Sequence, residues 1–187
     1  MKSLDLTVLK DAVPVRDWWL GRAIGRAILR MARWSFAGEV PNVSKAVIVV
    51  APHTSNWDFV VGAAAMLAAD LEVRWLGKHT LFEGPLAPLM NGLGGIPVNR
   101  SLPGRGVVED MAALIHAEDH LLLALAPEGT RSRVDRWKTG FHRIALAGGV
   151  PIVPVALDYG PREIRFGPVV VPGDDSASDS ARLQSFF

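Results

Sequence analysis

The chain has 187 residues, 49% of them hydrophobic and 21% charged, so it is long enough and apolar enough to bury a core. It contains no cysteine, which excludes disulfides, thiolate metal sites and a cysteine nucleophile. The net charge is only +1, but residues 1–36 hold seven basic and three acidic side chains, so this segment carries +4 and the rest carries −3. A basic segment on a slightly acidic body indicates an anionic partner, either a membrane surface or a nucleic acid.

Residues 17–36 are predicted to form an amphipathic helix. Arginines at 22, 26, 30 and 33 follow one helical spacing, and apolar residues at 20, 24, 27, 28, 31 and 34 follow another. This pattern suits a helix in a lipid interface, and it also suits a helix packed on its own domain. The tryptophans at 18, 19 and 34 favour the membrane. We therefore expect a membrane-contacting helical segment over 1–40 and an α/β domain over 41–187.

Strands and helices are predicted to alternate from residue 45 onward. Apolar, β-branched runs predict strands, and helical periodicity predicts the segments between them. The expected strands are 45–51, 73–76, 95–100, 120–126 and 150–157, with short ones near 162–165 and 169–171, and the expected helices are 57–69, 106–117 and 141–147. Asn56 is the expected N-cap of the helix at 57–69. The polar residues from 173 are expected to be a flexible connection, with Leu183, Phe186 and Phe187 docking a last helical turn. The predicted fold class is α/β, a single-domain mixed β-sheet flanked by helices.

His53 and Asp58 form the first candidate site. The histidine comes directly after a predicted buried strand, and the aspartate falls in the first turn of the next helix. This spacing allows the carboxylate to fold back onto one imidazole nitrogen and leave the other facing a cleft, which is how a general base is built. The same spacing also suits a simple helix cap and turn. No G-x-S-x-G motif and no cysteine supplies a nucleophile, so the proton would come from a substrate hydroxyl.

A second group of polar residues follows other predicted strands. The loop APEGTRSR at 126–133 combines a glycine, hydroxyls and two arginines, which suits an anion, although a solvated polar turn would have the same composition. GGIPVNR at 94–100 places another arginine at the end of a strand, and Lys78 and Lys138 add cations. Together these residues predict a cleft for a phosphate-bearing molecule.

These motifs, in this order and together with VPIVPVAL at 150–157, resemble the four sequence blocks of the glycerolipid acyltransferase family. The resemblance covers roughly residues 45–160 and is to the short bacterial form typified by the lysophosphatidic acid acyltransferases. It implies the fold of the glycerol-3-phosphate acyltransferases and an O-acyltransferase of phospholipid biosynthesis. It also implies that His53 deprotonates the acceptor hydroxyl and that Asp58 orients it.

The resemblance implies roles for the other candidates too. The acceptor and phosphate site would be Lys78, Asn99, Arg100, Glu128, Gly129, Thr130 and Arg131, and the acyl-donor side or its supporting residues would be Lys138 and Pro151. The donor would be acyl-CoA or acyl carrier protein, and the acceptor a lysophospholipid, first of all 1-acylglycerol 3-phosphate giving phosphatidic acid. Another lysolipid such as lyso-ornithine lipid, or a phospholipid acting as donor in a transacylase, stays open.

The competing function class is a non-catalytic, lipid-binding membrane adaptor. We expect no cofactor and no metal; the HAEDH segment at 116–120 has the wrong spacing for a helical metal motif. A nucleic-acid partner is not expected, because aromatic residues are not interleaved with the basic ones. The N-terminal half has neither a signal-peptide pattern nor the roughly 20 apolar residues of a membrane span. We therefore expect peripheral attachment at the cytoplasmic face of the membrane.

Overall fold

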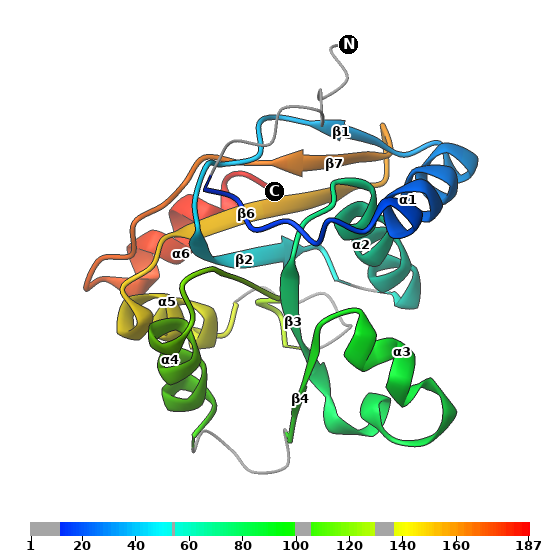
Figure 1. The fold of residues 1–187 in the computed structure, drawn as a ribbon. Coiled ribbons are helices and arrows are strands. Elements are labelled where there is room, and N and C mark those ends of the chain that lie inside the picture. Colours follow the sequence, from blue (N-terminus) through cyan, green and yellow to red (C-terminus); the bar gives the residue numbers. More distant parts are fainter. Residues whose placement is uncertain (1–11, 54, 100–105, 130–136) are drawn as a thin grey trace.

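A seven-stranded sheet forms the centre of the protein. The computed structural model describes residues 12–53, 55–99, 106–129 and 137–187. The strands are β1 (Ser35–Ala37), β2 (Lys45–Ala51), β3 (Val73–Lys78), β4 (Gly95–Val98), β5 (Leu121–Leu125), β6 (Ile152–Asp158) and β7 (Glu163–Phe166). They lie in the order β1-β7-β6-β2-β5-β3-β4 (Figure 1). β7 runs antiparallel to β6 while the other neighbours are parallel, so the predicted mixed sheet is confirmed.

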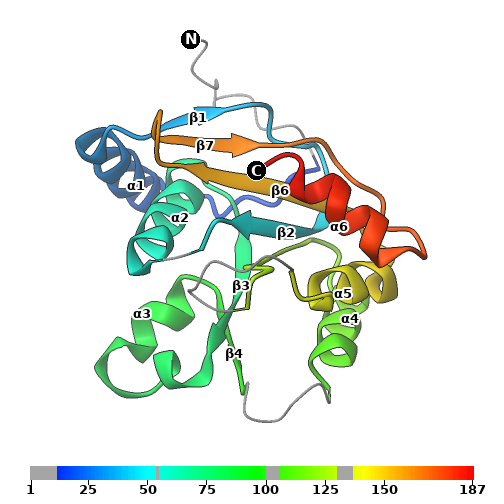
Figure 2. The ribbon, with the colours of Figure 1, turned by 180° about the vertical axis from the view of Figure 1, so that it is seen from behind.

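Helices cover both faces of this sheet (Figures 1 and 2). The α-helices are α1 (Trp19–Ala32), α2 (Asn56–Ala68), α3 (Ala87–Gly92), α4 (Val107–Ala117), α5 (Gly140–Gly148) and α6 (Ser176–Gln184), and two 3-10 turns, η1 (His79–Phe82) and η2 (Gly84–Leu86), precede α3. Alternate residues of β2 point to opposite faces, as pleating requires. Ala46 and Ile48 join the core beneath α1 and α2, whereas Val47 and Val49 join the core beneath α4, α5 and α6.

Helix α1 packs on α2 and is part of the domain. Its buried face contains Gly21, Gly25 and Leu29, and the Arg22 guanidinium lies 3.2 Å from the buried Asp70 carboxylate at the end of α2. The backbone of Trp18 donates to the same carboxylate at 3.2 Å. The described part of the expected segment 1–40 therefore shares its core with the α/β domain, and its contact with a membrane stays a prediction.

Several predicted elements differ from the structure. The first helix ends at Ala32 because Arg33 adopts a left-handed conformation with φ 59°, and 35–37 form β1 instead of a last helical turn. Ser55, rather than Asn56, is the N-cap of α2. The predicted strand near 169–171 is reduced to an isolated bridge between Val170 and Ile152. The expected tail contains α6, whose first amides are capped by the Asp175 carboxylate, and the expected docking of Leu183 is confirmed by its burial. No helix among the described residues is long and apolar enough to cross a membrane.

Candidate active site

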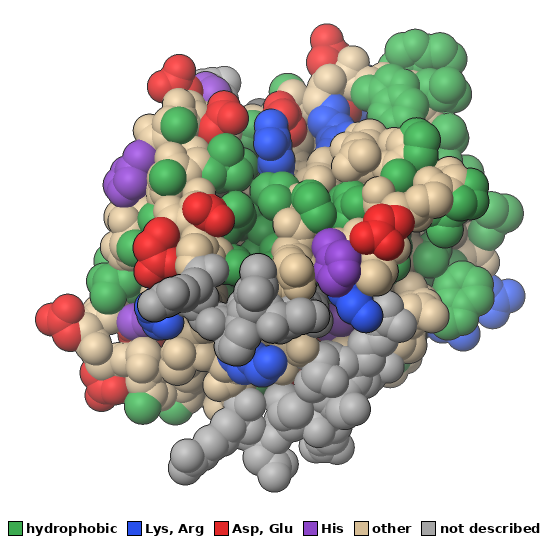
Figure 3. All heavy atoms as spheres, turned by 90° about the horizontal axis from the view of Figure 1, so that it is seen from below, with side chains coloured by type: hydrophobic (Ala, Val, Ile, Leu, Met, Phe, Trp, Pro, Cys, Tyr) green, Lys and Arg blue, Asp and Glu red, His purple; other side chains and the backbone are tan. Residues whose placement is uncertain are grey.

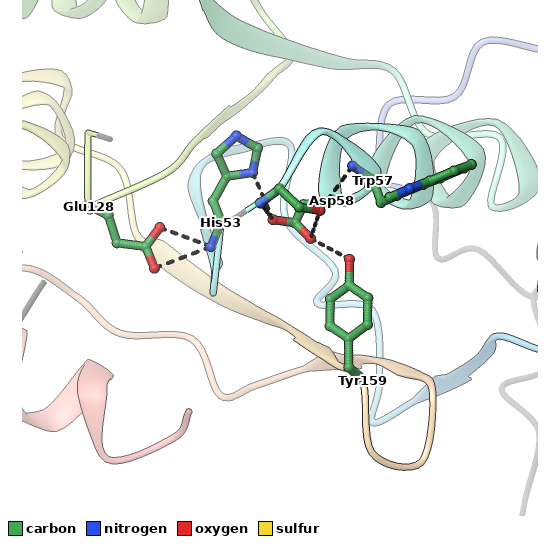
Figure 4. Close-up of polar contacts among 6 residues, drawn as sticks. His53, Trp57, Asp58, Glu128 and Tyr159 are labelled. Carbon is green, nitrogen blue, oxygen red and sulfur yellow. Dashed lines mark hydrogen bonds and ion pairs between the residues drawn. The ribbon is translucent and has the colours of Figure 1, made fainter. Parts of the chain in front are cut away.

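Three neighbouring strands bring the candidate site together. β5, β2 and β6 are adjacent and parallel, so their carboxyl ends lie at the same edge of the sheet. His53 follows β2, Glu128 follows β5, and Tyr159 follows β6. In α/β sheets this edge is where ligands bind, because the loops after the strands are free to carry functional groups. Figure 4 shows the His53 ring and the Tyr159 hydroxyl beside Asp58 at the beginning of α2, and the Glu128 carboxylate beside the His53 backbone.

His53 and Asp58 lie together as predicted. The His53 Nδ1 atom is 3.7 Å from Asp58 Oδ2, an ion-pair distance rather than a close hydrogen bond. The Asp58 side chain is fully buried, whereas that of His53 is 28% exposed. The other ring nitrogen of His53 points away from Asp58 (Figure 4). A buried carboxylate beside one nitrogen stabilises the imidazolium, and the second nitrogen is left to exchange a proton with a bound molecule.

Asp58 is fixed by the beginning of its own helix. The Ser55 backbone N–H donates to Asp58 Oδ2 at 2.7 Å, and the Ser55 hydroxyl donates to Oδ1 at 3.3 Å. The same hydroxyl accepts from the Trp57 N–H at 3.0 Å. Ser55 and Asp58 form a capping box, in which the side chain of each residue accepts the backbone N–H of the other. A carboxylate at this position is also favoured by the helix dipole. The local sequence S-x-x-D therefore positions the acid at the first turn of α2, beside the His53 ring.

Glu128 supports His53 from the neighbouring strand. Its carboxylate accepts the His53 backbone N–H, with Oε2 at 2.9 Å and Oε1 at 3.2 Å. The residue is buried. Burial raises the pKa of Glu128, the hydrogen bond from the His53 backbone opposes this shift, and the nearby charge of Asp58 adds to it. These contacts give Glu128 a role in holding the histidine loop; contact with an acceptor stays a prediction.

Tyr159 is a member of the site that sequence reasoning missed. Its hydroxyl donates a hydrogen bond to Asp58 Oδ1. Burial, then the hydrogen bond to Asp58, raises the pKa of Tyr159 to about 12, against an opposing contact with Ser55. The available signal was its position: it comes directly after the predicted strand at 150–157, at the edge where the other site residues were expected. The pattern of residues did not indicate its partner, which is 101 positions away.

The other predicted site residues are divided between the two edges of the sheet. Lys78 ends β3 and Asn99 follows β4, and both strands run parallel to β5, so these residues lie at the same edge as His53. The Lys138 side chain packs over Gly129, so closely that a Cβ built on that glycine would lie 2.8 Å from Lys138 Cδ. Pro151 precedes β6 and accepts the Val47 N–H at 2.9 Å, at the opposite edge from the site. This placement fits packing behind the site. Arg100, Thr130 and Arg131 lie outside the described residues.

The arrangement can support acid–base chemistry. It provides a half-exposed imidazole, a buried carboxylate beside it and two further polar groups that hold these two in place. Within the described ranges, no three histidine or acidic side chains are grouped so as to hold a metal ion. An imidazole held in this way can act as a base toward the hydroxyl of a bound molecule.

Comparison with known proteins places the chain in a family. A family model described as "Acyltransferase" matches residues 34–158, about two thirds of the chain. The match runs from β1 to the end of β6 and thus includes His53, Asp58, Lys78, Asn99 and Glu128. The resemblance inferred from the four sequence blocks is confirmed at the level of this family.

Individual relatives are similar over part of their length. The chain is 30% identical over 115 residues to a 1-acyl-sn-glycerol-3-phosphate acyltransferase of Salmonella typhimurium. The matched region covers 59% of the chain and 46% of that protein. It is 31% identical over 117 residues to a Synechococcus protein named CTP synthase, covering 63% of the chain but 20% of that protein. The chain thus spans less than half the length of these curated relatives.

A solved structure shares the fold. The crystal structure of the 1-acyl-sn-glycerophosphate (LPA) acyltransferase PlsC from Thermotoga maritima superimposes with a TM-score of 0.60 and 18% sequence identity. The match covers 89% of this chain and 75% of that one. At this identity the likeness bears on architecture, and it confirms the fold expected from the sequence.

Proposed function

This chain belongs to the acyltransferase family, and we propose that it transfers a fatty acyl group from an acyl thioester to the free hydroxyl of a lysophospholipid. The observation that carries the proposal is the His53–Asp58 pair at the carboxyl end of β2. His53 takes the proton of the acceptor hydroxyl as its oxygen attacks the thioester carbonyl. The C–S bond of the resulting tetrahedral intermediate then breaks, and the proton passes from the imidazolium to the departing thiolate.

No acyl-enzyme intermediate is needed in this mechanism. The chain has no cysteine, and the contact that the structure gives for the His53 ring is with the Asp58 carboxylate, which suits a base that acts on a bound hydroxyl. The buried Asp58 carries a negative charge next to His53 Nδ1, which favours the imidazolium that forms during attack. Acyl-CoA and acyl carrier protein both supply the thioester that this reaction requires.

We propose 1-acylglycerol 3-phosphate as the acceptor, which makes the product phosphatidic acid. Lys78 lies at the same sheet edge as His53, and an ammonium group there suits a phosphate. The names of the Salmonella and Thermotoga relatives point to the same acceptor. A headgroup without phosphate, as in lyso-ornithine lipid, would make no comparable use of this cation.

The test is an acyl-transfer assay of the purified protein with a panel of lysolipids, each offered with acyl-CoA and with acyl carrier protein. We expect the highest kcat/KM with 1-acylglycerol 3-phosphate. A Lys78→Ala variant should raise the KM for that acceptor and leave the KM for the donor unchanged. Binding of lipid without any transfer would contradict the proposal and favour an adaptor. A preference for lysolipids that lack phosphate would contradict the choice of acceptor.

We further propose that α1 attaches the protein to a membrane surface. Leu20, Ile24 and Met31 form an apolar stripe on the side of α1 away from α2, and Met31 is 78% exposed. Arginines at 26 and 30 are exposed beside this stripe. Hydrophobic side chains gather along the right-hand side of Figure 3, the side on which α1, α2 and α3 lie in Figure 1. A basic, apolar face of this kind is typical of helices that lie in the lipid interface.

Trp57 brings this apolar surface next to the site. It is 70% exposed in the first turn of α2 and directly precedes Asp58 in the sequence. Substituting Leu20, Ile24 and Met31 by serine should strongly reduce cosedimentation with anionic phospholipid vesicles. Leu146→Ser is the matched control, because Leu146 is 45% exposed on α5, which covers the other face of the sheet. Equal binding by the triple variant and the wild type would contradict attachment through α1. The cytoplasmic face stays a prediction.

A further inference from the structure

We propose that Tyr159 is a positioning residue of the acyl-transfer site, whose hydroxyl fixes the Asp58 carboxylate in the orientation that serves His53. The inference rests on the proposed function and adds to it a residue that follows β6, on the other side of β2 from Glu128. It is carried by the hydrogen bond from the Tyr159 hydroxyl to Asp58 Oδ1 (Figure 4). Tyr159 touches the acid rather than the reacting atoms, so it would act through Asp58.

The two oxygens of Asp58 have different tasks in this arrangement. Oδ2 faces His53 Nδ1 at 3.7 Å and accepts the Ser55 N–H at 2.7 Å. Oδ1 accepts the Ser55 hydroxyl at 3.3 Å and the Tyr159 hydroxyl. Both Ser55 contacts come from the residue that begins the same helix, so they fix the carboxylate from one side only. Tyr159 approaches from β6 and so opposes rotation of the carboxylate away from His53.

The hairpin that carries Tyr159 is itself held in place. The Tyr159 ring packs edge to face against Trp34, with ring centroids 5.0 Å apart and planes at 86°. In the same β6–β7 connection, the Arg162 guanidinium donates to the Ala32 carbonyl at 3.0 Å, and the Arg162 carbonyl accepts the Ser35 N–H at 3.0 Å. These contacts anchor Tyr159 to the segment that follows α1, and they oppose movement of the phenol ring away from its position.

The electrostatic surroundings of Asp58 explain why a neutral donor suits this position. Three residues from three strand ends surround Asp58. His53 follows β2, Glu128 follows β5 and Tyr159 follows β6. The carboxylates of Asp58 and Glu128 lie near one another, so a further anionic group would be unfavourable at this position, whereas a neutral hydrogen-bond donor is favourable. Because the pKa of Tyr159 is raised to about 12, the phenol keeps its proton at neutral pH and remains a donor.

The contact itself can be measured without any substrate. Tyr159 is the only tyrosine in the chain, so the ultraviolet absorbance of phenolate reports on this one residue. In the wild type the phenol should stay protonated at about pH 10.5, above the ordinary pKa of about 10. In Asp58→Asn the titration midpoint should fall, because the negative charge that holds the proton is gone. Identical titration curves for the two proteins would overturn the proposal, and circular dichroism at each pH confirms that the fold persists.

The functional consequence is tested with Tyr159→Phe, which keeps the ring and its contact with Trp34 but removes the hydroxyl. We expect kcat to fall by about tenfold, a part of the 10²–10⁴ that a general base contributes, while the KM for the lysolipid stays within about twofold. The acid limb of the rate profile should also move to higher pH. Without the donor the carboxylate keeps more of its negative charge toward His53, which raises the pKa of the imidazole.

Trp34→Phe is the control, since it alters the ring contact and leaves the hydroxyl in place; its kcat should stay within about twofold of the wild type. A wild-type kcat and an unshifted profile for Tyr159→Phe would overturn the proposal. So would an equal loss in both variants, because it would assign the effect to packing of the hairpin. If the wild type transferred no acyl group to any lysolipid, the proposed function itself would fail, whatever the titration showed.

Discussion

Replacing Gly25 by alanine should destabilise the protein, because α1 and α2 touch through the backbone at this point. A Cβ on Gly25 would lie 2.5 Å from the Ala68 nitrogen and 2.6 Å from the Ala64 oxygen, both in the backbone of α2. Ordinary contacts begin near 3.4 Å, so α1 would have to move by about 1 Å. Overpacking of this kind costs about 1–3 kcal/mol, and alanine regains about 0.5–1 kcal/mol in helix propensity.

The expected net loss is therefore up to about 2.5 kcal/mol, equivalent to a fall in Tm of up to about 10 °C for a domain of this size. Gly62→Ala is the matched control within α2, since a Cβ there meets nothing within 4 Å. It should raise Tm by about 1–4 °C through helix propensity alone. Thermal unfolding followed by circular dichroism compares the two variants directly. Equal stabilisation by both substitutions would refute the seating of α1 on α2.

Two further predictions concern the carboxyl groups of Glu128 and Asp179, whose pKa values are shifted in opposite directions. The pKa of Glu128 is raised in the folded protein, so the wild type should lose stability as pH rises from 4.5 through the folded pKa. Urea titrations at about pH 5 and pH 8 should show this loss in the wild type and not in Glu128→Gln. A common pH dependence for both proteins would contradict burial of the charge. Hydrogen bonds from the Gly173 N–H at 2.6 Å and from the buried His142 at 3.0 Å hold the pKa of Asp179 below 3.8. Asp179→Asn should lower the free energy of unfolding at neutral pH by about 1 kcal/mol, and the difference should shrink as pH falls below about 3.8. If the variant and the wild type differed in free energy of unfolding by the same amount at neutral pH and below about pH 3.8, the charge of Asp179 would not be involved.

The central strands could be predicted because their local composition agrees with their final environment. The run at 45–51 is β2 to the residue, and it is apolar from Ala46 onward because both of its faces contribute to the core. Helix α1 was predicted too long, since the pairing of 35–37 with β7 depends on a strand 128 positions away. Helix α6 was predicted only as a last helical turn docked by Leu183, because eight of its nine residues are polar or alanine and Leu183 is its one buried residue.

The candidate site divides in a similar way. His53 and Asp58 are near neighbours in the chain, and the capping box of Ser55 and Asp58 fixes the carboxylate beside the histidine, so spacing alone was informative. The contact from Tyr159 to Asp58 depends on β6 lying beside β2, and no local pattern carries that information. The role of Glu128 illustrates a further limit. Its charge suggested a position facing the acceptor, whereas the structure buries the carboxylate against the His53 backbone N–H.

The most direct test of the account is the rate of acyl transfer by His53→Ala beside that of His116→Ala. His116 is an exposed histidine on α4, and its Nε2 lies 3.0 Å from the Ala147 carbonyl oxygen, outside the site. If His53 is the general base, its loss should lower kcat by about 10²–10⁴ with the Tm unchanged, and His116→Ala should retain the wild-type rate. A folded His53→Ala protein that kept most of its activity would contradict the assignment.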